Sequence, residues 1–255
     1  MGKKIVLLTL VLVFLLSAMV VASLAQTRTV GVSVGDWFKY GTVEVSWSSN
    51  DPNATFPPYD YEWLKEQNET DWLLLSVTEV SGTNVTCQAT THFKNGTEKI
   101  EGGNVNIDAG DGNMTFMAVS ANLETNDTLY TSGDYSSYKI NETIVRIYPG
   151  GVRNANHLNI TQEFTWTVNL TQNSYYYSMN FYWDRSTGVF IEESWEAINH
   201  TGEYLTTWSA LSRITESNVW VVPEFPTWAS VLILSVVLTF AIAIYKRKLI
   251  KTRIN

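Results

Sequence analysis

An uncharged apolar run near the C-terminus is the feature that most constrains how this chain can fold. It extends from Trp228 to Tyr245, eighteen residues without a charged side chain. About 20 apolar helical residues span the roughly 30 Å hydrocarbon core of a bilayer, and amphipathic aromatic residues favour its two interfaces. Five lysines and arginines follow within the last ten residues, which predicts that this end stays in the cytoplasm. The sequence therefore predicts one C-terminal transmembrane helix, with a domain outside the cell.

A second apolar segment lies at the N-terminus and has different flanks. Ile5–Val21 follows two lysines and precedes small residues at Ser23 and Ala25. A short basic region, an apolar core and this spacing of small residues are typical of a secretory signal peptide, here cut after Ala25; the alternative is an uncleaved anchor. The predicted divisions are a signal peptide (1–25), an extracellular domain (26–216), a short stalk (217–226), a transmembrane helix (227–245) and a basic cytoplasmic tail (246–255).

The stalk contains Pro223-Glu224-Phe225, just ahead of the apolar run and the basic tail. This three-part arrangement resembles the PEF-type C-terminal sorting signals of archaeal cell-surface proteins. The resemblance is confined to the C-terminal end of the chain, and it implies a protein held at the cell surface. In some proteins with related signals the chain is cut near the motif and joined to a lipid, whereas in others the helix remains as the anchor.

The extracellular domain is strongly acidic. From Gln26 to Val222 it has ten lysines and arginines against twenty-four aspartates and glutamates, a net charge of −14, whereas the whole chain has −8. This charge argues against nucleic acid as a partner and against a second contact with a membrane surface. Cys87 is the only cysteine, so no intrachain disulfide can form and a hydrophobic core must supply the stability.

Ten Asn-x-Thr sequons lie in the domain, and each is a potential acceptor of an N-linked glycan. All ten use threonine although serine is also common in the domain, which indicates selection for glycan acceptors. A glycan requires solvent around its asparagine, so the sequons also predict the outer surface. The acceptors are Asn53, Asn68, Asn84, Asn95, Asn113, Asn126, Asn141, Asn159, Asn169 and Asn199.

Most of the domain has the sequence pattern of β-strands. Segments rich in β-branched and aromatic residues are separated by turn residues, as in an antiparallel all-β protein. Asn95-Gly96 predicts a tight hairpin in which both residues have positive φ, and Asp184–Gly188 predicts another hairpin. The predicted strands are Trp37–Trp47, Leu73–Ser81, Val85–Lys94, Thr97–Ile107, Tyr138–Tyr148, Leu158–Leu170, Tyr175–Trp183, Val189–Ala197 and Tyr204–Ile214.

Two short segments refine this fold class. Pro57-Pro58 excludes a strand interior, and Tyr59–Gln67 has a helical composition, so one short helix is predicted there. Tyr182–Phe190 contains an aromatic-Asp-x-x-Thr-Gly turn and resembles the strand–turn–strand of LolA-like lipoprotein carrier domains. That resemblance implies a single curved half-barrel sheet; a two-sheet β-sandwich is the alternative.

No catalytic, cofactor or metal signature stands out. Ser136 and Lys139 have the spacing of an acyl-enzyme pair, but a strand would place them on opposite faces. The oxygen-rich run Asn104–Asn113 does not match the glycine and glutamate positions of a calcium-binding loop, and the three histidines are scattered. We therefore expect neither a metal nor a cofactor.

The strand Tyr175–Trp183 places Tyr176 and Tyr182 on the face opposite its most apolar residues, where two rings could stack on a sugar or line a lipid groove. We expect a membrane-anchored surface glycoprotein with a structural or interaction role in the envelope, and no enzymatic activity. The alternative is a surface module that binds a lipid or a glycan. The expected partners are the membrane and envelope proteins, glycans or lipids, but not nucleic acid.

Overall fold

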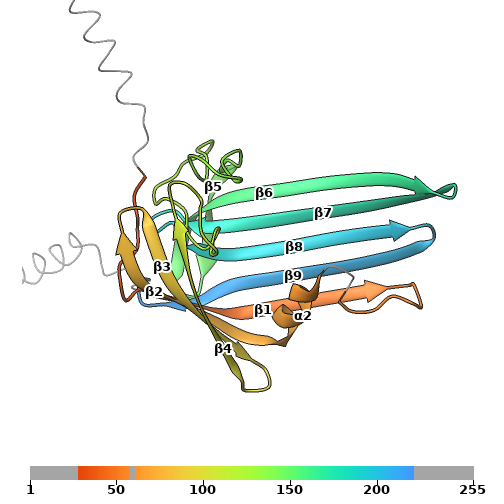
Figure 1. Cartoon of the computed structure of the whole chain (residues 1–255), viewed down its shortest axis with the longest axis horizontal. Coiled ribbons are helices and arrows are strands. Elements are labelled where there is room, and N and C mark those ends of the chain that lie inside the picture. The colour runs from red at the N-terminus through yellow and green to blue at the C-terminus, as the bar shows by residue number, and fades with distance from the viewer. Residues whose placement is uncertain (1–27, 58–60, 221–255) are drawn as a thin grey trace, which may run out of the picture.

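The structure, a computed structural model, describes residues 28–57 and 61–220. They form one antiparallel sheet in the order β4-β3-β2-β1-β9-β8-β7-β6-β5, with one short helix (Figure 1). The sheet does not close, because β4 and β5 lie at its two ends. The prediction of an all-β single sheet is confirmed, and the two-sheet sandwich is wrong. The elements are β1 (Trp37–Ser49), α2 (Glu62–Glu69), β2 (Thr70–Ser81), β3 (Asn84–Phe93), β4 (Glu98–Asn106), β5 (Glu142–Tyr148), β6 (Gly151–Val168), β7 (Thr171–Asp184), β8 (Phe190–Thr201) and β9 (Tyr204–Ser217).

The signal peptide, the sorting motif Pro223-Glu224-Phe225, the transmembrane helix and the basic tail lie outside the described residues. Within residues 28–57 and 61–220, no helix is long and apolar enough to cross a membrane.

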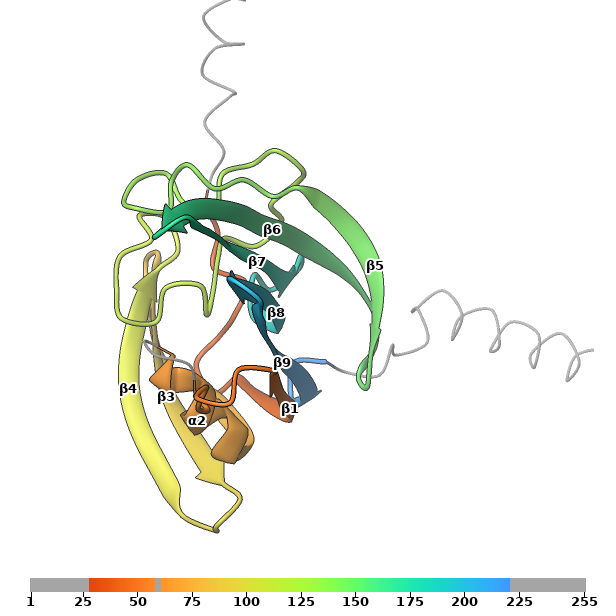
Figure 2. The same ribbon diagram turned by 90° about the vertical axis from the view of Figure 1, so that its right-hand side faces the viewer.

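Viewed along its long strands, the sheet bends in two directions (Figure 2). Strands β2–β4 curve towards the face that carries Phe181 and Trp183 of β7, which we call the core face. Strand β5 curves towards the opposite face, which carries Tyr182. Alternation along β7 sends neighbouring side chains to these two faces, and both are buried here: Trp183 is 0% exposed and Tyr182 is 8% exposed. The two halves of the curved sheet therefore enclose apolar side chains on both faces at one end of the long strands.

A long connection between β4 and β5 fills the concave core face. This connection, residues 107–141, contributes fully buried Leu123, Leu129 and Tyr130 to the same core as Trp183. Trp183 Nε1 donates to the carbonyl of Phe116 at 2.8 Å. Tyr130 donates to the carbonyl of Ala118 and accepts from the Phe116 amide, and burial raises its pKa to about 12. The connection is thus an ordered part of the core, although its sequence has the composition of a loop.

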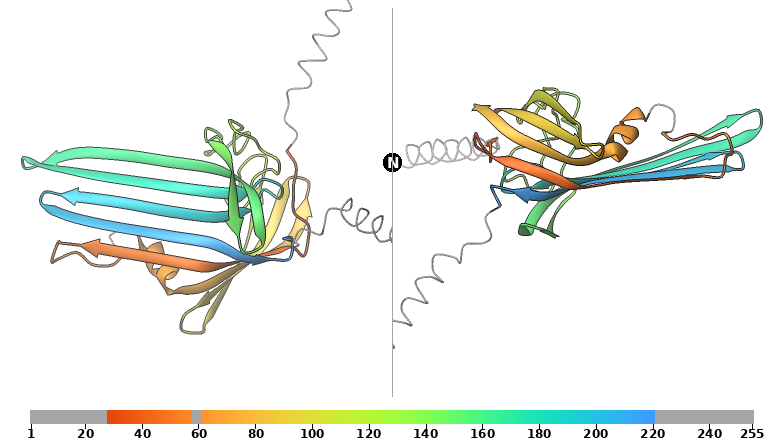
Figure 3. Two further views of the ribbon diagram at one scale, coloured as in Figure 1. Left: turned by 180° about the vertical axis from the view of Figure 1, so that it is seen from behind. Right: turned by 90° about the horizontal axis from the view of Figure 1, so that it is seen from below.

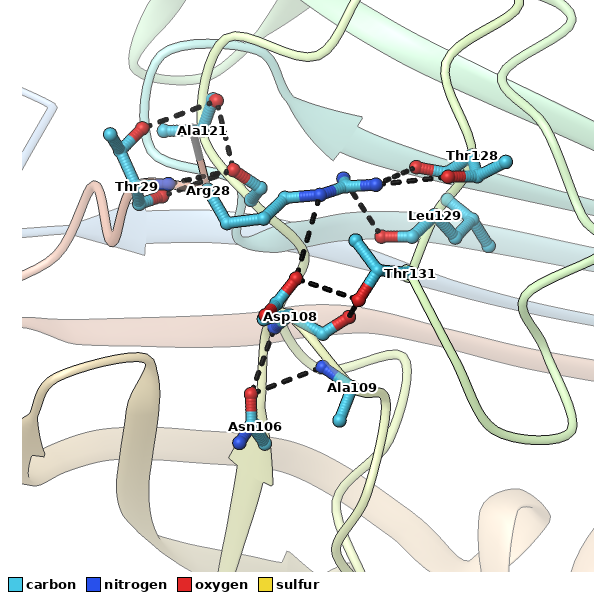
Figure 4. A network of polar contacts seen from close by, with 10 residues as sticks. Arg28, Thr29, Asn106, Asp108, Ala109, Ala121, Thr128, Leu129 and Thr131 are labelled. Carbon is cyan, nitrogen blue, oxygen red and sulfur yellow. Dashed lines mark hydrogen bonds and ion pairs between the residues drawn. The ribbon is translucent and has the colours of Figure 1, made fainter. Parts of the chain in front are cut away.

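Arg28, at the start of the described chain, holds this connection in place (Figure 4). Its guanidinium donates to the carbonyl and the hydroxyl of Thr128 at 2.9 Å each, and to the carbonyl of Leu129 at 3.3 Å. Arg28 Nε lies 4.0 Å from the Asp108 carboxylate, which also accepts from the Thr131 hydroxyl at 2.8 Å. The N-terminal segment therefore joins the start of the filling connection, at Asp108, to Thr128 and Leu129 farther along it.

The short helix lies on the core face, farther along the long strands (Figure 3). It was predicted at Tyr59–Gln67 and is observed at Glu62–Glu69. Its fully buried Leu64 packs with Ala197 of β8 and Trp208 of β9 in a second, smaller cluster. The sequence located the helix correctly to within a few residues, because the prolines before it end β1 and leave a short amphipathic segment.

The Asn95-Gly96 hairpin exists, but the predicted turn type is wrong. Only Gly96 has a positive φ, +84°, and the Gly96 amide donates to the carbonyl of Phe93 at 2.8 Å. The Phe93 amide in turn donates to the carbonyl of Thr97 at 2.9 Å. This is a three-residue loop with glycine in the left-handed position, the next most common hairpin connection, so Asn95 does not need a strained backbone.

Candidate interaction surfaces

The concave core face, where a ligand would lie in a half-barrel carrier, is occupied by the chain itself. The Asp184–Gly188 turn anchors the filling connection: the Val119 amide donates to the carbonyl of Gly188 at 2.9 Å, and the Asn122 amide to that of Arg185 at 2.7 Å. Gly188 has φ +72°, and a Cβ there would lie 2.1 Å from the carbonyl oxygen of Val119. The turn therefore acts as an attachment point for residues 107–141, which occupy the concave core face on that side.

The side chain of Asp184 explains why this turn needs its particular sequence. Asp184 is 1% exposed, and its Oδ1 accepts from the amides of Ser186 and Thr187 and from both of their hydroxyls. Its other oxygen lies 3.9 Å from Arg153 of β6. These contacts compensate the buried carboxylate, so the motif that resembles carrier domains has a structural role here.

The two tyrosines predicted to form a ligand platform differ in their surroundings. Tyr182 is covered on its ring faces: His157 stacks on it at 4.5 Å between centroids, and the Arg146 guanidinium lies 4.2 Å from its centroid. Burial raises the pKa of the Tyr182 hydroxyl. Tyr176 is half-buried and lies opposite Glu163 and Ile198 on the neighbouring strands. The pair therefore does not form one open aromatic surface, because the bend of β5 carries Arg146 over the first ring.

Arginines and aromatic rings pack together between β5 and this opposite face of the sheet. Glu192, only 5% exposed, is bound at 2.6 Å by Arg146 and at 3.3 Å by Arg213. The Arg213 guanidinium also lies 4.7 Å from the ring centroid of Tyr148. One buried carboxylate between two arginines, each over an aromatic ring, fixes β5 against β8 and β9. No sequence pattern predicts this cluster, because its members come from four separate strands.

Beyond the packed end, the long strands continue as a single layer, which we call the distal platform. It comprises β1 from Val43 to Ser49, β6 from Ile160 to Val168, and the parts of β7, β8 and β9 that lie between them. Strand β2 pairs with β1 only at Trp37–Tyr40, and β5 pairs with β6 only as far as His157. Within residues 28–57 and 61–220, no strand pairs with the outer edges of β1 and β6 along the platform, and such edges are sites where another strand can pair.

The platform carries exposed aromatic and aliphatic side chains near the end of β6. Phe164, Trp166 and Val168 are 48%, 42% and 52% exposed, and all lie on the core face beyond the reach of α2. Trp166 and Tyr204 border an open hollow of about 620 Å³ at the β6–β7 and β8–β9 turns. The sequence did not predict this surface, because apolar residues that alternate along a strand are typical of a face that packs on the core. Only the structure shows that these residues are exposed.

Most of the sequons lie where a glycan would be surrounded by solvent. Eight of the ten acceptor asparagines are exposed, and the two others, Asn159 and Asn199, are half-buried. Asn159 Nδ2, the atom that would carry the glycan, donates to Asn180 at 2.9 Å and to Ser178 at 3.1 Å. The exposed acceptors are Asn53, Asn68, Asn84, Asn95, Asn113, Asn126, Asn141 and Asn169.

The oxygen-rich run before the filling connection is engaged in local hydrogen bonds. Asn106 Oδ1 accepts from the amides of Asp108 and Ala109, and Asn113 Oδ1 accepts from the amide of Asn104. The Asp108 carboxylate faces Arg28, as noted above. Among residues 28–57 and 61–220, no group of three or more histidine, cysteine, aspartate or glutamate side chains could hold a metal ion. Thus the asparagines and aspartates of this run shape a turn.

Comparison with known proteins gives no family for this chain. No protein-family model matches it, and no curated protein sequence is significantly similar to it.

Proposed function

We propose that this chain is a membrane-anchored, N-glycosylated cell-surface protein whose β domain has a structural or interaction role in the envelope. The observation that carries the proposal is the exposure of eight of the ten sequon asparagines. They come from both ends of the domain, from hairpin turns and from the filling connection. The C-terminal apolar run with its basic tail and the PEF-type resemblance support the anchor and the surface location.

The filled concave face favours an interaction role over ligand transport. A lipid carrier needs an enclosed apolar cavity, and here Leu123, Leu129 and Tyr130 occupy the space between the curved strands. The free edges of β1 and β6 on the distal platform instead offer backbone groups to a partner strand. In the described part of the chain, the backbone amides and carbonyls on these two strand edges therefore lie at the surface, where a partner could pair with them.

A second candidate function is the binding of a glycan or lipid at the end of the distal platform. It is favoured by the hollow beside Trp166 and Tyr204, because exposed aromatic rings stack on sugars and on apolar chains. Titration of the protein with oligosaccharides or lipid micelles, followed by tryptophan fluorescence, tests it. Binding that is lost in Trp166→Ala and kept in Trp63→Ala would support this candidate.

Glycopeptide mass mapping of the native membrane-bound protein tests the leading proposal. We expect glycans at several exposed sequons, including Asn95 at its hairpin turn, and an unmodified Asn159. Asn159 is the matched control because its acceptor atom is already hydrogen-bonded between β6 and β7. If all eight exposed asparagines are bare, the proposal of a surface glycoprotein is wrong.

Extraction of membranes with alkaline carbonate tests the anchor separately. The full chain should stay in the membrane pellet, and a chain that ends at Val222 should be released as a folded, soluble domain. A full chain that is extracted with the soluble proteins would contradict the anchor.

A further inference from the structure

The β5–β6 hairpin exposes three β-branched apolar side chains on one outer surface. Val145, Ile147 and Val152 are 67%, 72% and 65% exposed. Ile147 lies opposite Val152 in the ladder, and Val145 is two residues along the same strand, so the three are neighbours on one face. Their alternating neighbours Arg146 and Tyr148 point the other way, into the arginine cluster. We call these three residues the hairpin patch.

The described chain ends against this hairpin. Trp220, the last described residue, is 6% exposed, and its ring centroid lies 5.7 Å from that of Tyr148. The Arg153 guanidinium lies 4.8 Å from the Trp220 ring centroid. A Cβ at Gly150, in the hairpin turn, would lie only 2.5 Å from Trp220 Cε3, so the turn fits closely around the indole. The described chain therefore ends against the β5–β6 hairpin, on the face opposite the hairpin patch.

Little chain separates this point from the apolar C-terminal run. Residues 221–227 are seven in number, and at about 3.3–3.6 Å per residue they can span at most about 25 Å. Val34, which is 63% exposed, lies in a turn that Asn218 contacts, because Asn218 donates to the carbonyl of Gly35 at 3.0 Å. Exposed aliphatic side chains thus occur on two turns that the last described residues touch.

The local charge of the hairpin differs from that of the domain. Residues 142–153 contain Arg146 and Arg153 against Glu142 alone, whereas the domain as a whole is strongly acidic. The acceptor asparagines nearest in sequence to the hairpin patch are Asn141 and Asn159, four residues before Val145 and seven residues after Val152. Both arginines lie on the other face of the hairpin, Arg146 against Glu192 and Arg153 against Asp184. The hairpin patch itself is therefore aliphatic and uncharged, which suits contact with the boundary between lipid headgroups and acyl chains.

We propose that the hairpin patch rests on the outer surface of the lipid bilayer, so that the domain is docked on the membrane instead of moving freely on its stalk. This inference rests on the proposed C-terminal anchor. It also replaces the expectation, drawn from net charge, that the domain makes no second contact with the membrane. Net charge averages over the whole surface, whereas this contact depends on three uncharged side chains.

Spin labels on the full chain, reconstituted into phosphatidylcholine–phosphatidylglycerol vesicles, test the docking. In a Cys87→Ala background, one label replaces Ile147 and another, in a separate variant, replaces Ile100 of β4. Ile100 is the matched control, since it is also an exposed isoleucine on a strand, 60% against 72%. We expect the label at 147 to become several-fold more accessible to oxygen than to a water-soluble nickel complex, relative to the label at 100. A third variant, Val152→Cys, should follow the label at 147.

The outcomes separate the docking from the anchor. If the chain floats with the vesicles but the labels at 147, 152 and 100 are equally accessible to the nickel complex, the docking is wrong and the anchor stands. If the chain does not float with the vesicles, the anchor fails and the docking falls with it.

Discussion

The two ends of the long strands, the packed end and the distal platform, differ in how far the faces of the sheet are covered. At the packed end, residues 107–141 cover the core face and β5 covers the opposite face, so Trp183 and Ile191 are completely buried. On the distal platform α2 and Phe56 of the loop before it cover part of one face, and Phe164, Trp166 and Val168 stay exposed. The comparison indicates that the platform forms because its strands continue from a packed base, since a single layer buries too little apolar surface for independent stability.

The difference also divides the roles of the aromatic residues between stability and recognition. Aromatic side chains occur along the whole length of β7, from Tyr175 to Trp183, but the tertiary cover on them decides what they contribute. A ring enclosed on all sides contributes to the free energy of folding, whereas a ring left in solvent is available to a partner.

The largest expected effect is at Trp183. Trp183→Ala should lower the free energy of unfolding by about 3–5 kcal/mol, because it leaves a cavity and removes the hydrogen bond to Phe116. Trp166→Ala on the distal platform should cost less than about 1 kcal/mol, since that ring is 42% exposed. Urea unfolding of the released domain measures both. Equal losses would show that the two ends do not differ in packing.

Leu64→Ala should destabilise the platform without unfolding the packed end. Leu64 is the fully buried contact of α2 with Trp208 and Ala197, so its truncation should cost about 2–4 kcal/mol locally. Hydrogen exchange should show faster exchange at the amides of Trp208 and Ala197, with those of Trp183 and Ile191 unchanged. Faster exchange at all four amides would mean that the two ends unfold as one unit.

Two glycines with positive φ provide a matched pair. Gly188→Ala and Gly202→Ala both place a side chain at positive φ, +72° and +62°. At Gly202, in the platform, the nearest atom is a flexible Thr171 methyl at 3.1 Å, whereas at Gly188 it is the Val119 carbonyl at 2.1 Å. We expect Gly188→Ala to cost about 1–3 kcal/mol more than Gly202→Ala, because the filling connection must move. Thermal melting of the two variants would contradict this if their midpoints agree.

The smallest effect on stability, and a clear kinetic one, concerns Cys87. Burial raises the pKa of its thiol to about 11, and only the thiolate reacts with alkylating reagents. Ionisation therefore stays slight below pH 9 and increases as the pH approaches 11. Iodoacetamide at pH 8 should modify Cys87 only as fast as the packed end opens, whereas a cysteine introduced by Leu170→Cys, at a fully exposed platform turn, should react at once. Rapid modification of Cys87 would show that the packed end opens readily.

The sequence by itself determined the elements of this domain. Runs of β-branched and aromatic residues located the strands, Asp184–Gly188 located a hairpin, and the prolines before α2 located the helix, because each signal depends on neighbours within a few residues. Asn95-Gly96 gave the hairpin but not its turn type, since the length of the loop depends on how β3 and β4 pair. The ten sequons were also evident, but their exposure was not.

Only the tertiary structure decided how these elements combine. β1 pairs along its length with β9, the last strand, and this contact spans more than 150 residues. No local pattern specifies that pairing, the filling of the concave face by residues 107–141, or the position of Arg146 over Tyr182. Those features depend on contacts between residues that are far apart in the sequence. Such contacts bury apolar surface only when the whole sheet has assembled. For the same reason one face of β6 is buried at Leu158, in the packed end, and exposed at Phe164 and Trp166, on the platform.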